Sequence, residues 1–209
     1  MSPTFSAAIR PGKPHKPAAP DLSVFSILRP STDELRRLVD EEKAHGRFSY
    51  TEIGATGSVL PDGYHHDRWQ TDLGPDDGER FRLASDALRQ WQPQRGAGIR
   101  VFPDEPVQPD GTIALVIRAG LLFVTAVGRV VYVVEEPNRF AFAYGTLTAH
   151  PERGEEAFAV IREDGRVRFE IVAFSRPRHP LARLGAPMTR LMQVRVTHAY
   201  LEAMQTASA

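Results

Sequence analysis

Cysteine is absent from the 209 residues of the chain, and neither sign of charge is in excess. Without cysteine the protein forms no disulfide, has no thiolate nucleophile and builds no cysteine-based zinc site. The 26 Lys and Arg residues balance the 26 Asp and Glu residues, so no overall field favours nucleic acid or an anionic membrane surface. We therefore expect no nucleic-acid partner.

Long apolar runs are also missing. No stretch approaches the roughly 20 apolar residues that a membrane-spanning helix needs. Residues 1–20 are rich in proline and lack both periodic apolar positions and the apolar segment of a secretory signal. We predict a cytoplasmic protein with a flexible arm over 1–20. A single domain over 21–209 follows, and its first part, 21–47, is a helical extension.

Local signals in the first half of the chain indicate two helices. Ser31 and Glu34 have the spacing of a capping box and Gly46 suits a helix end, which predicts a helix over 32–45. A second helix is predicted over 75–92, with Pro75 in its first turn and Pro93 ending it. Alternation and turn residues predict strands over 64–73, 99–102, 112–119, 121–127, 129–135, 139–148, 156–162 and 167–174.

The last part of the chain, 180–204, carries one apolar stripe at helical spacing. A long amphipathic helix buries its stripe, and the preceding strands supply a sheet to receive it. Strand, helix, strand meander and long helix, in this order, predict an α+β fold of the helix-grip type, in which a curved antiparallel sheet wraps a C-terminal helix. The stripe consists of Leu184, Met188, Leu191, Met192, Val196, Tyr200 and Met204.

Three long motifs resemble a known family, together with the shorter ALRQW (87–91) and AFSRP (173–177). The long motifs are TEIGATG (51–57), LPDGYHHDRWQTDLG (60–74) and FAYGTLTAHPERGEEAF (142–158). They are similar to a bacterial and plant family that carries a domain-of-unknown-function name and sits near the START/Bet v 1-like (SRPBCC) superfamily. The resemblance covers roughly 48–204. It implies the helix-grip fold and, because relatives in that superfamily bind lipids, steroids or polyketides, a hydrophobic ligand. It implies no established reaction.

Polar residues within these motifs are candidates for ligand contacts. Tyr144 shares a strand face with aromatic residues, so it either packs in the core or presents its hydroxyl to a ligand. Glu155 and Glu156 either begin a strand or cap a backbone amide, or one of them pairs with His150 at the mouth of a cavity. The candidate ligand-binding residues are Tyr64, His65, His66, Tyr144, His150, Glu155 and Glu156.

Three functions fit these observations. The protein binds a hydrophobic small molecule or lipid between sheet and helix, or it is an enzyme of the cyclase, hydrolase or isomerase type that uses His, Glu and Tyr groups there. The third option is a protein-interaction or regulatory module. A polar cluster in the cavity would favour the enzyme, and a wholly apolar cavity the binding protein. No metal or cofactor is expected, because the histidine spacing fits no metal motif and neither GxGxxG nor a P-loop is present.

Overall fold

The computed structural model describes residues 24–148, 150–177 and 186–209, and their side chains except at 177 and 186–192. The predicted arm over 1–20 and the predicted start of the last helix lie outside these residues. The strands are β1 (Phe25–Ser26), β2 (His65–Pro75), β3 (Arg100–Phe102), β4 (Thr112–Ala119), β5 (Leu122–Glu136), β6 (Arg139–Thr146), β7 (Glu152–Glu163) and β8 (Arg166–Pro177). The helices are α1 (Thr32–His45), the 3-10 turn η2 (Ala55–Gly57), α2 (Arg80–Arg89), α3 (Gln92–Gly96) and α5 (Ala186–Ala207).

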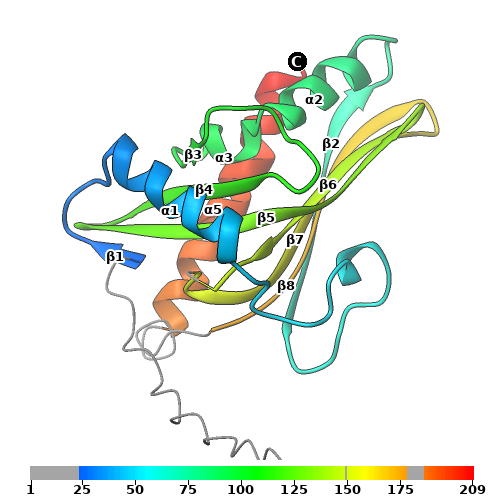
Figure 1. Cartoon of the computed structure of the whole chain (residues 1–209). Helices are drawn as coiled ribbons and strands as arrows, with labels where there is room; N and C mark the ends of the chain where they lie inside the picture. The colour runs from blue at the N-terminus through cyan, green and yellow to red at the C-terminus, as the bar shows by residue number, and fades with distance from the viewer. Residues whose placement is uncertain (1–23, 149, 178–185) are drawn as a thin grey trace, which may run out of the picture.

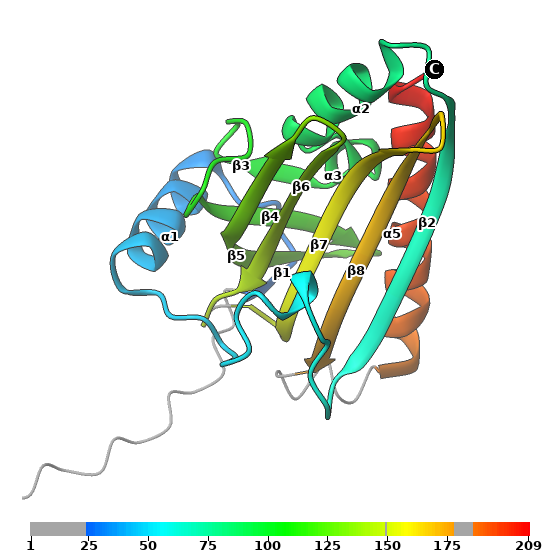
Figure 2. The ribbon, with the colours of Figure 1, turned by 90° about the vertical axis from the view of Figure 1, so that its right-hand side faces the viewer.

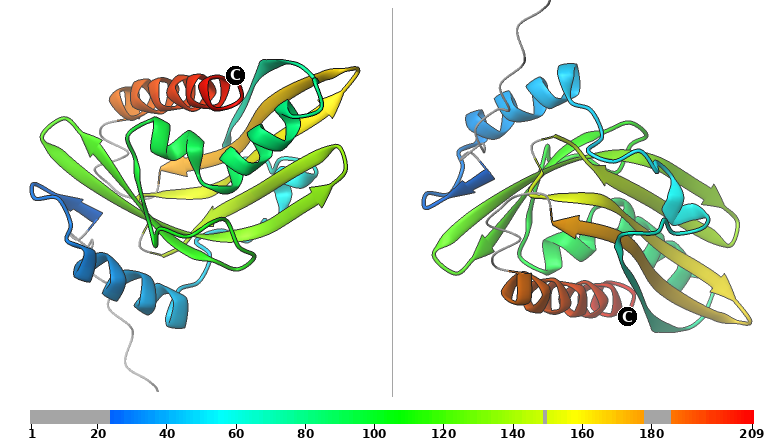
Figure 3. Two further views of the ribbon diagram at one scale, coloured as in Figure 1. Left: turned by 90° about the horizontal axis from the view of Figure 1, so that it is seen from above. Right: turned by 90° about the horizontal axis from the view of Figure 1, so that it is seen from below.

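The strands form one curved antiparallel sheet (Figure 1). Its order is β2-β8-β7-β6-β5-β4-β3, and β1 pairs with β5 off this path. Figure 3 shows α5, α2 and α3 on the concave face of the sheet and α1 on the opposite face. Figure 2 shows α5 running beside β2 and β8. The described part of the chain thus confirms the predicted α+β helix-grip fold.

The main core lies between the sheet and the helices α2, α3 and α5. Trp91, Phe142 and Phe158 are at most 1% exposed, and the rings of Phe142 and Phe158 stack with centroids 5.4 Å apart. From α5, Tyr200 and Met204 are 4% and 0% exposed. Full burial of an apolar side chain stabilises a fold by about 1.5–3 kcal/mol, so these residues help to hold α5 on the core. The stripe is confirmed at Val196, Tyr200 and Met204, whereas 184, 188, 191 and 192 lie outside the described side chains.

Helix α1 forms where it was predicted. The Glu34 backbone N–H donates to Ser31 Oγ at 3.3 Å, and the Ser31 N–H donates to Glu34 Oε2 at 2.8 Å, so both halves of the capping box are present. Leu35 and Val39 pack in a second apolar cluster with residues of β4 and β5 on the convex side of the sheet. Helix α1 therefore buries part of its apolar side against the sheet.

Two sequence predictions are wrong where tertiary contacts override local signals. The helix predicted over 75–92 is two helices, since Pro75 ends β2 and Pro93 lies in the first turn of α3. The strands predicted over 121–127 and 129–135 are one strand, β5. Gly128 lies within β5 and allows β6 to approach closely, since a Cβ there would lie 3.2 Å from both the Gly145 carbonyl oxygen and the Tyr144 ring.

Gly154 in β7 is expected to be sensitive to substitution. Its φ is +154°, and a Cβ would lie 1.9 Å from the carbonyl oxygen of Phe174 on the neighbouring strand. Gly154→Ala should therefore lower the free energy of unfolding by about 2 kcal/mol or more, because backbone must move. Denaturant melts compare it with Gly57→Ala, whose Cβ would approach nothing closer than 3.7 Å. Equal stability of the two variants would show that β7 and β8 are spaced differently.

Candidate functional site

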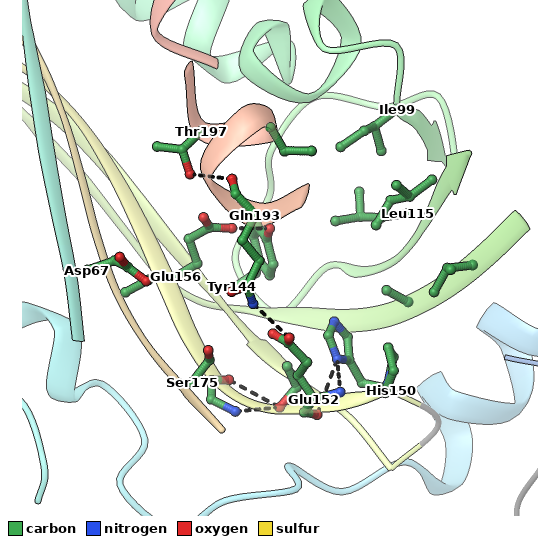
Figure 4. Close-up of a pocket in the computed structure, with 18 of the residues that line it drawn as sticks. Asp67, Ile99, Leu115, Tyr144, His150, Glu152, Glu156, Ser175, Gln193 and Thr197 are labelled. Atoms are coloured by element: carbon green, nitrogen blue, oxygen red, sulfur yellow. Dashed lines mark hydrogen bonds between the residues drawn. The ribbon is translucent and has the colours of Figure 1, made fainter. Parts of the chain in front are cut away.

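A cavity of about 520 Å³ lies between the concave face of the sheet and α5 (Figure 4). Its apolar walls come from the sheet and from α5, and the helix contributes Val196. The polar groups come from β2, β6, β7, β8, the residues just before β7, and α5. The apolar lining includes Phe25, Trp69, Ile99, Leu115, Ile117, Leu122, Val124, Ala126 and Ile171.

A hydrogen-bonded carboxyl and phenol lie on the sheet side of the cavity. The Tyr144 hydroxyl donates to Glu156 Oε2 at 2.5 Å. Burial disfavours the charged carboxylate and raises the pKa of Glu156 to about 7, with the carboxylates of Glu152 and Asp67 adding to the rise and the Tyr144 hydrogen bond opposing it. Burial, and next the Glu156 charge, hold the pKa of Tyr144 well above its ordinary value. Near neutral pH, Glu156 can therefore exchange a proton while Tyr144 keeps its own.

A second phenol faces the cavity from α5. Tyr200 is 4% exposed, lines the cavity and packs edge-on against Phe158. Its hydroxyl makes no hydrogen bond to any side chain or backbone group that the structure describes. Burial and the Glu156 charge raise the pKa of Tyr200, so it remains a neutral donor. Tyr200 thus offers the cavity an O–H group that a ligand could use.

The polar end of the cavity also holds His150, Glu152 and Gln193 (Figure 4). His150 Nδ1 lies 3.0 Å from the Glu152 backbone nitrogen and 3.2 Å from the Glu152 carbonyl oxygen, so the Glu152 backbone orients the imidazole. Gln193 of α5 donates from Nε2 to Glu152 Oε1 at 2.7 Å. The Gln193–Glu152 hydrogen bond ties α5 to the first residue of β7.

Glu155 touches the cavity, but its carboxylate makes its hydrogen bonds on the convex side of the sheet. Successive strand residues face opposite ways, so Glu155 and Glu156 diverge. Glu155 is 3% exposed, and its oxygens accept from the Tyr50 hydroxyl at 2.6 Å, the Gly54 N–H at 2.8 Å, the Thr56 N–H at 3.0 Å and the Thr56 hydroxyl at 2.5 Å. The predicted alternative in which a glutamate caps backbone amides describes Glu155. Both its oxygens are taken by this segment rather than by His150.

The remaining candidates from β2 and the residue before it lie elsewhere. The Tyr64 hydroxyl donates to Glu52 Oε2 at 3.0 Å, and His66 Nε2 lies 2.8 Å from the Pro61 carbonyl oxygen. His65 Nε2 is 3.6 Å from the Asp67 carboxylate. Among the described residues, none of these three candidates lines the cavity, and β2 contributes Asp67 and Trp69 instead.

Sequence reasoning missed several cavity residues. Asp67, Glu152, Gln193 and Thr197 line the cavity but were not candidates, and Tyr200 was assigned to packing alone. The alternation of β2 could have found Asp67, because it shares a strand face with Trp69. In the described ranges, no three His, Asp or Glu side chains gather as they would around a metal ion. No helix in those ranges is long and apolar enough to cross a bilayer.

Comparison with solved structures bears on the fold. The ZhuI aromatase/cyclase from Streptomyces sp. R1128 superposes with a TM-score of 0.53 at 14% identity, over 69% of this chain and 93% of that one. The likeness shows the fold, which is that of the START/Bet v 1-like (SRPBCC) proteins.

The family follows from sequence. Residues 49–203 match the model of the domain of unknown function DUF1990, and the chain belongs to this family. A UPF0548 protein of Deinococcus radiodurans is 38% identical over 204 residues, covering 87% of this chain and 98% of the relative. A UPF0548 protein of Arabidopsis thaliana is 32% identical over 122 residues, which cover 55% of this chain and 60% of the relative. The resemblance inferred from the three motifs is confirmed.

Proposed function

We propose that the protein binds a hydrophobic small molecule or lipid in the cavity between the sheet and α5. The observation that carries this proposal is the cavity itself, about 520 Å³ with largely apolar walls. Pockets for small organic ligands fall in the range of about 300–1,000 Å³ and combine apolar walls with a few placed polar groups. An apolar ligand that covers these walls removes them from water, which favours binding.

The distribution of polar groups constrains the ligand further. Glu156, Tyr144 and Tyr200 face the cavity, whereas Ile99, Leu115 and similar side chains form other parts of its wall. A buried hydroxyl or carboxyl costs free energy unless it is hydrogen-bonded. The ligand that satisfies both surfaces is mostly apolar and carries a hydrogen-bonding group, such as a carbonyl or hydroxyl, at one position.

A cavity-filling variant tests this proposal. Leu115 is 4% exposed and lines the cavity, so Leu115→Trp should occupy part of its volume. Native mass spectrometry of purified protein should detect a small apolar molecule on the wild type, or added tetralin where none co-purifies. Leu115→Trp should weaken tetralin binding at least about tenfold, since the ligand loses its volume and contacts.

The matched control is Leu121→Trp at the β4–β5 turn, where the side chain is 86% exposed. Thermal melting confirms that both variants fold. Equal tetralin affinity in the wild type and both variants would place binding outside the cavity, and no binding by the wild type at millimolar tetralin would contradict the proposal.

A further inference from the structure

We propose that the protein catalyses proton transfer on an apolar ketone, with Glu156 as the acid–base group and the Tyr200 hydroxyl as hydrogen-bond donor to the ketone oxygen. The inference rests on the proposed binding function and names the substrate class and reaction of the same cavity. It is carried by two polar groups that converge on the cavity from opposite walls, Glu156 from β7 and Tyr200 from α5.

The hydrogen bond from Tyr144 decides which oxygen of Glu156 can react. Oε2 accepts the Tyr144 hydroxyl at 2.5 Å, and Oε1 makes no hydrogen bond to the described residues. Oε1 is therefore the oxygen that takes the proton and gives it back. It belongs to a residue that lines the cavity. Tyr144 acts here as a positioning residue, because it fixes the carboxyl rather than touching the substrate.

The Tyr200 hydroxyl supplies the second requirement of the reaction. A phenol that is 4% exposed, lines a cavity and has no partner among described residues is ready to donate to an oxygen of the occupant. Donors that are fixed before the reaction stabilise charge that develops on oxygen, and they do so most strongly where water is excluded. No other described lining residue offers both burial and an unused hydroxyl of this kind.

The reaction balances without a further reactant. The Glu156 carboxylate takes a proton from the carbon next to the carbonyl, so a C–H bond breaks and an O–H bond forms on Oε1. The electron pair of the C–H bond becomes the C=C bond of an enolate, whose negative oxygen accepts from Tyr200. Glu156 then gives a proton back to the same carbon after its O–H has exchanged with solvent water, or it gives the proton to a conjugated carbon when the ketone is unsaturated. The net result is proton exchange or isomerisation.

The other candidates are less suited to this role. Both oxygens of Glu155 are held by Tyr50, Gly54 and Thr56. His150 Nδ1 is engaged with the backbone of Glu152. Glu156, in contrast, has a pKa raised to about 7 by burial, which matches a base that works near neutral pH.

The test uses 2-tetralone and tetralin, which share one ring system and differ in the carbonyl. Ligand-observed NMR measures binding of each, and NMR in D₂O measures exchange of the 2-tetralone protons next to the carbonyl. Wild-type protein should bind both and accelerate exchange. Glu156→Gln should still bind 2-tetralone, but its exchange rate should fall at least about 100-fold. Tyr200→Phe should lower the exchange rate about 100-fold. Tyr144→Phe should shift the pH–rate profile toward higher pH, because it removes the hydrogen bond that favours the charged form of Glu156.

Two exposed or convex-side substitutions serve as matched controls. Glu136→Gln lies at an exposed position of β5, and Tyr64→Phe loses a hydroxyl that donates to Glu52 outside the cavity. Both should exchange 2-tetralone as the wild type does. The wild-type rate should rise with pH and level off above about 7, because the base must be ionised. The charged and titratable groups around it are Asp67 on β2, Tyr144 on β6, Glu152 on β7, His150 and Tyr200.

The outcomes separate this inference from the proposed function. Binding of tetralin and 2-tetralone without accelerated exchange overturns the catalytic inference and leaves ligand binding in place. Binding of tetralin but not of 2-tetralone also overturns it, because the site then rejects the ketone. Binding of neither molecule contradicts both proposals. Unchanged exchange in both Glu156→Gln and Tyr200→Phe would assign the reaction to other groups.

Discussion

Replacing Glu155 by alanine is expected to lower the free energy of unfolding by about 3–5 kcal/mol, because it removes several hydrogen bonds to one buried carboxylate and leaves their donors unsatisfied. The carboxylate is 3% exposed and accepts four hydrogen bonds from Tyr50, Gly54 and Thr56. Without it, these donors stay buried and unsatisfied, at about 1–3 kcal/mol each before relaxation. The segment over 50–57 should then detach from the convex side of the sheet.

Thermal melting measures this effect. For a domain of this size, a loss of 3–5 kcal/mol corresponds to a fall in Tm of roughly 6–20 °C. The control is Glu163→Ala at the far end of the same strand, whose carboxylate pairs with Arg168 and is 60% exposed. That change should cost less than about 1 kcal/mol. Equal Tm values for the two variants would mean that Glu155 is not the anchor of the segment.

Met204→Asp is the second substitution with a large expected effect. Met204 is 0% exposed on the inner side of α5 and belongs to the main core cluster. The substitution removes the contacts of a buried thioether and places a carboxyl without a designed partner in the core. We expect a loss of about 4 kcal/mol or more in the free energy of unfolding.

The neighbouring position provides the control. Gln205 is exposed, and its amide donates to Thr71 Oγ1 on β2 at 2.8 Å. Gln205→Asp adds the same charge to the same helix turn but should cost less than about 1 kcal/mol. Urea unfolding followed by circular dichroism compares the two. If both variants unfold at the same urea concentration, the inner side of α5 is not packed against the sheet.

Local sequence signals were sufficient to predict much of the fold. Ser31 and Glu34 predicted α1 because a capping box acts within four residues. The alternation of aromatic residues in β6 predicted a strand with an aromatic face in the core, and the helical stripe predicted a last helix packed on the sheet; the structure buries the opposite face of β6 as well. Such patterns depend on chain periodicity and little on distant contacts.

Errors arose where distant residues decide the outcome. Gly128 reads as a break between strands, yet it permits close approach of β6 within one continuous strand. Strand β7 begins at Glu152, four residues before the predicted start at 156, because its first residues pair with the extended end of β8. Placing Glu155 in a loop concealed the fact that Glu155 and Glu156 face opposite sides of the sheet.

The site was predictable only in part for the same reason. Tyr144, His150 and Glu156 were candidates and line the cavity. Tyr200 was assigned to the apolar stripe, because helical spacing does not distinguish a side chain that packs on the sheet from one that faces a cavity. The cavity depends on the separation between α5 and the sheet, which no local pattern encodes. Its polar residues therefore emerge from the three-dimensional structure.

The most direct test of ligand binding in the cavity is the position of bound tetralin in solution. Nuclear Overhauser effects between tetralin protons and the methyl groups of the isotopically labelled protein locate the ligand. The account predicts contacts to Ile99, Leu115 and Ile117, which line the cavity. Contacts confined to Val59 and Leu121, whose side chains are 85% and 86% exposed, or no contacts at saturating tetralin, would contradict it.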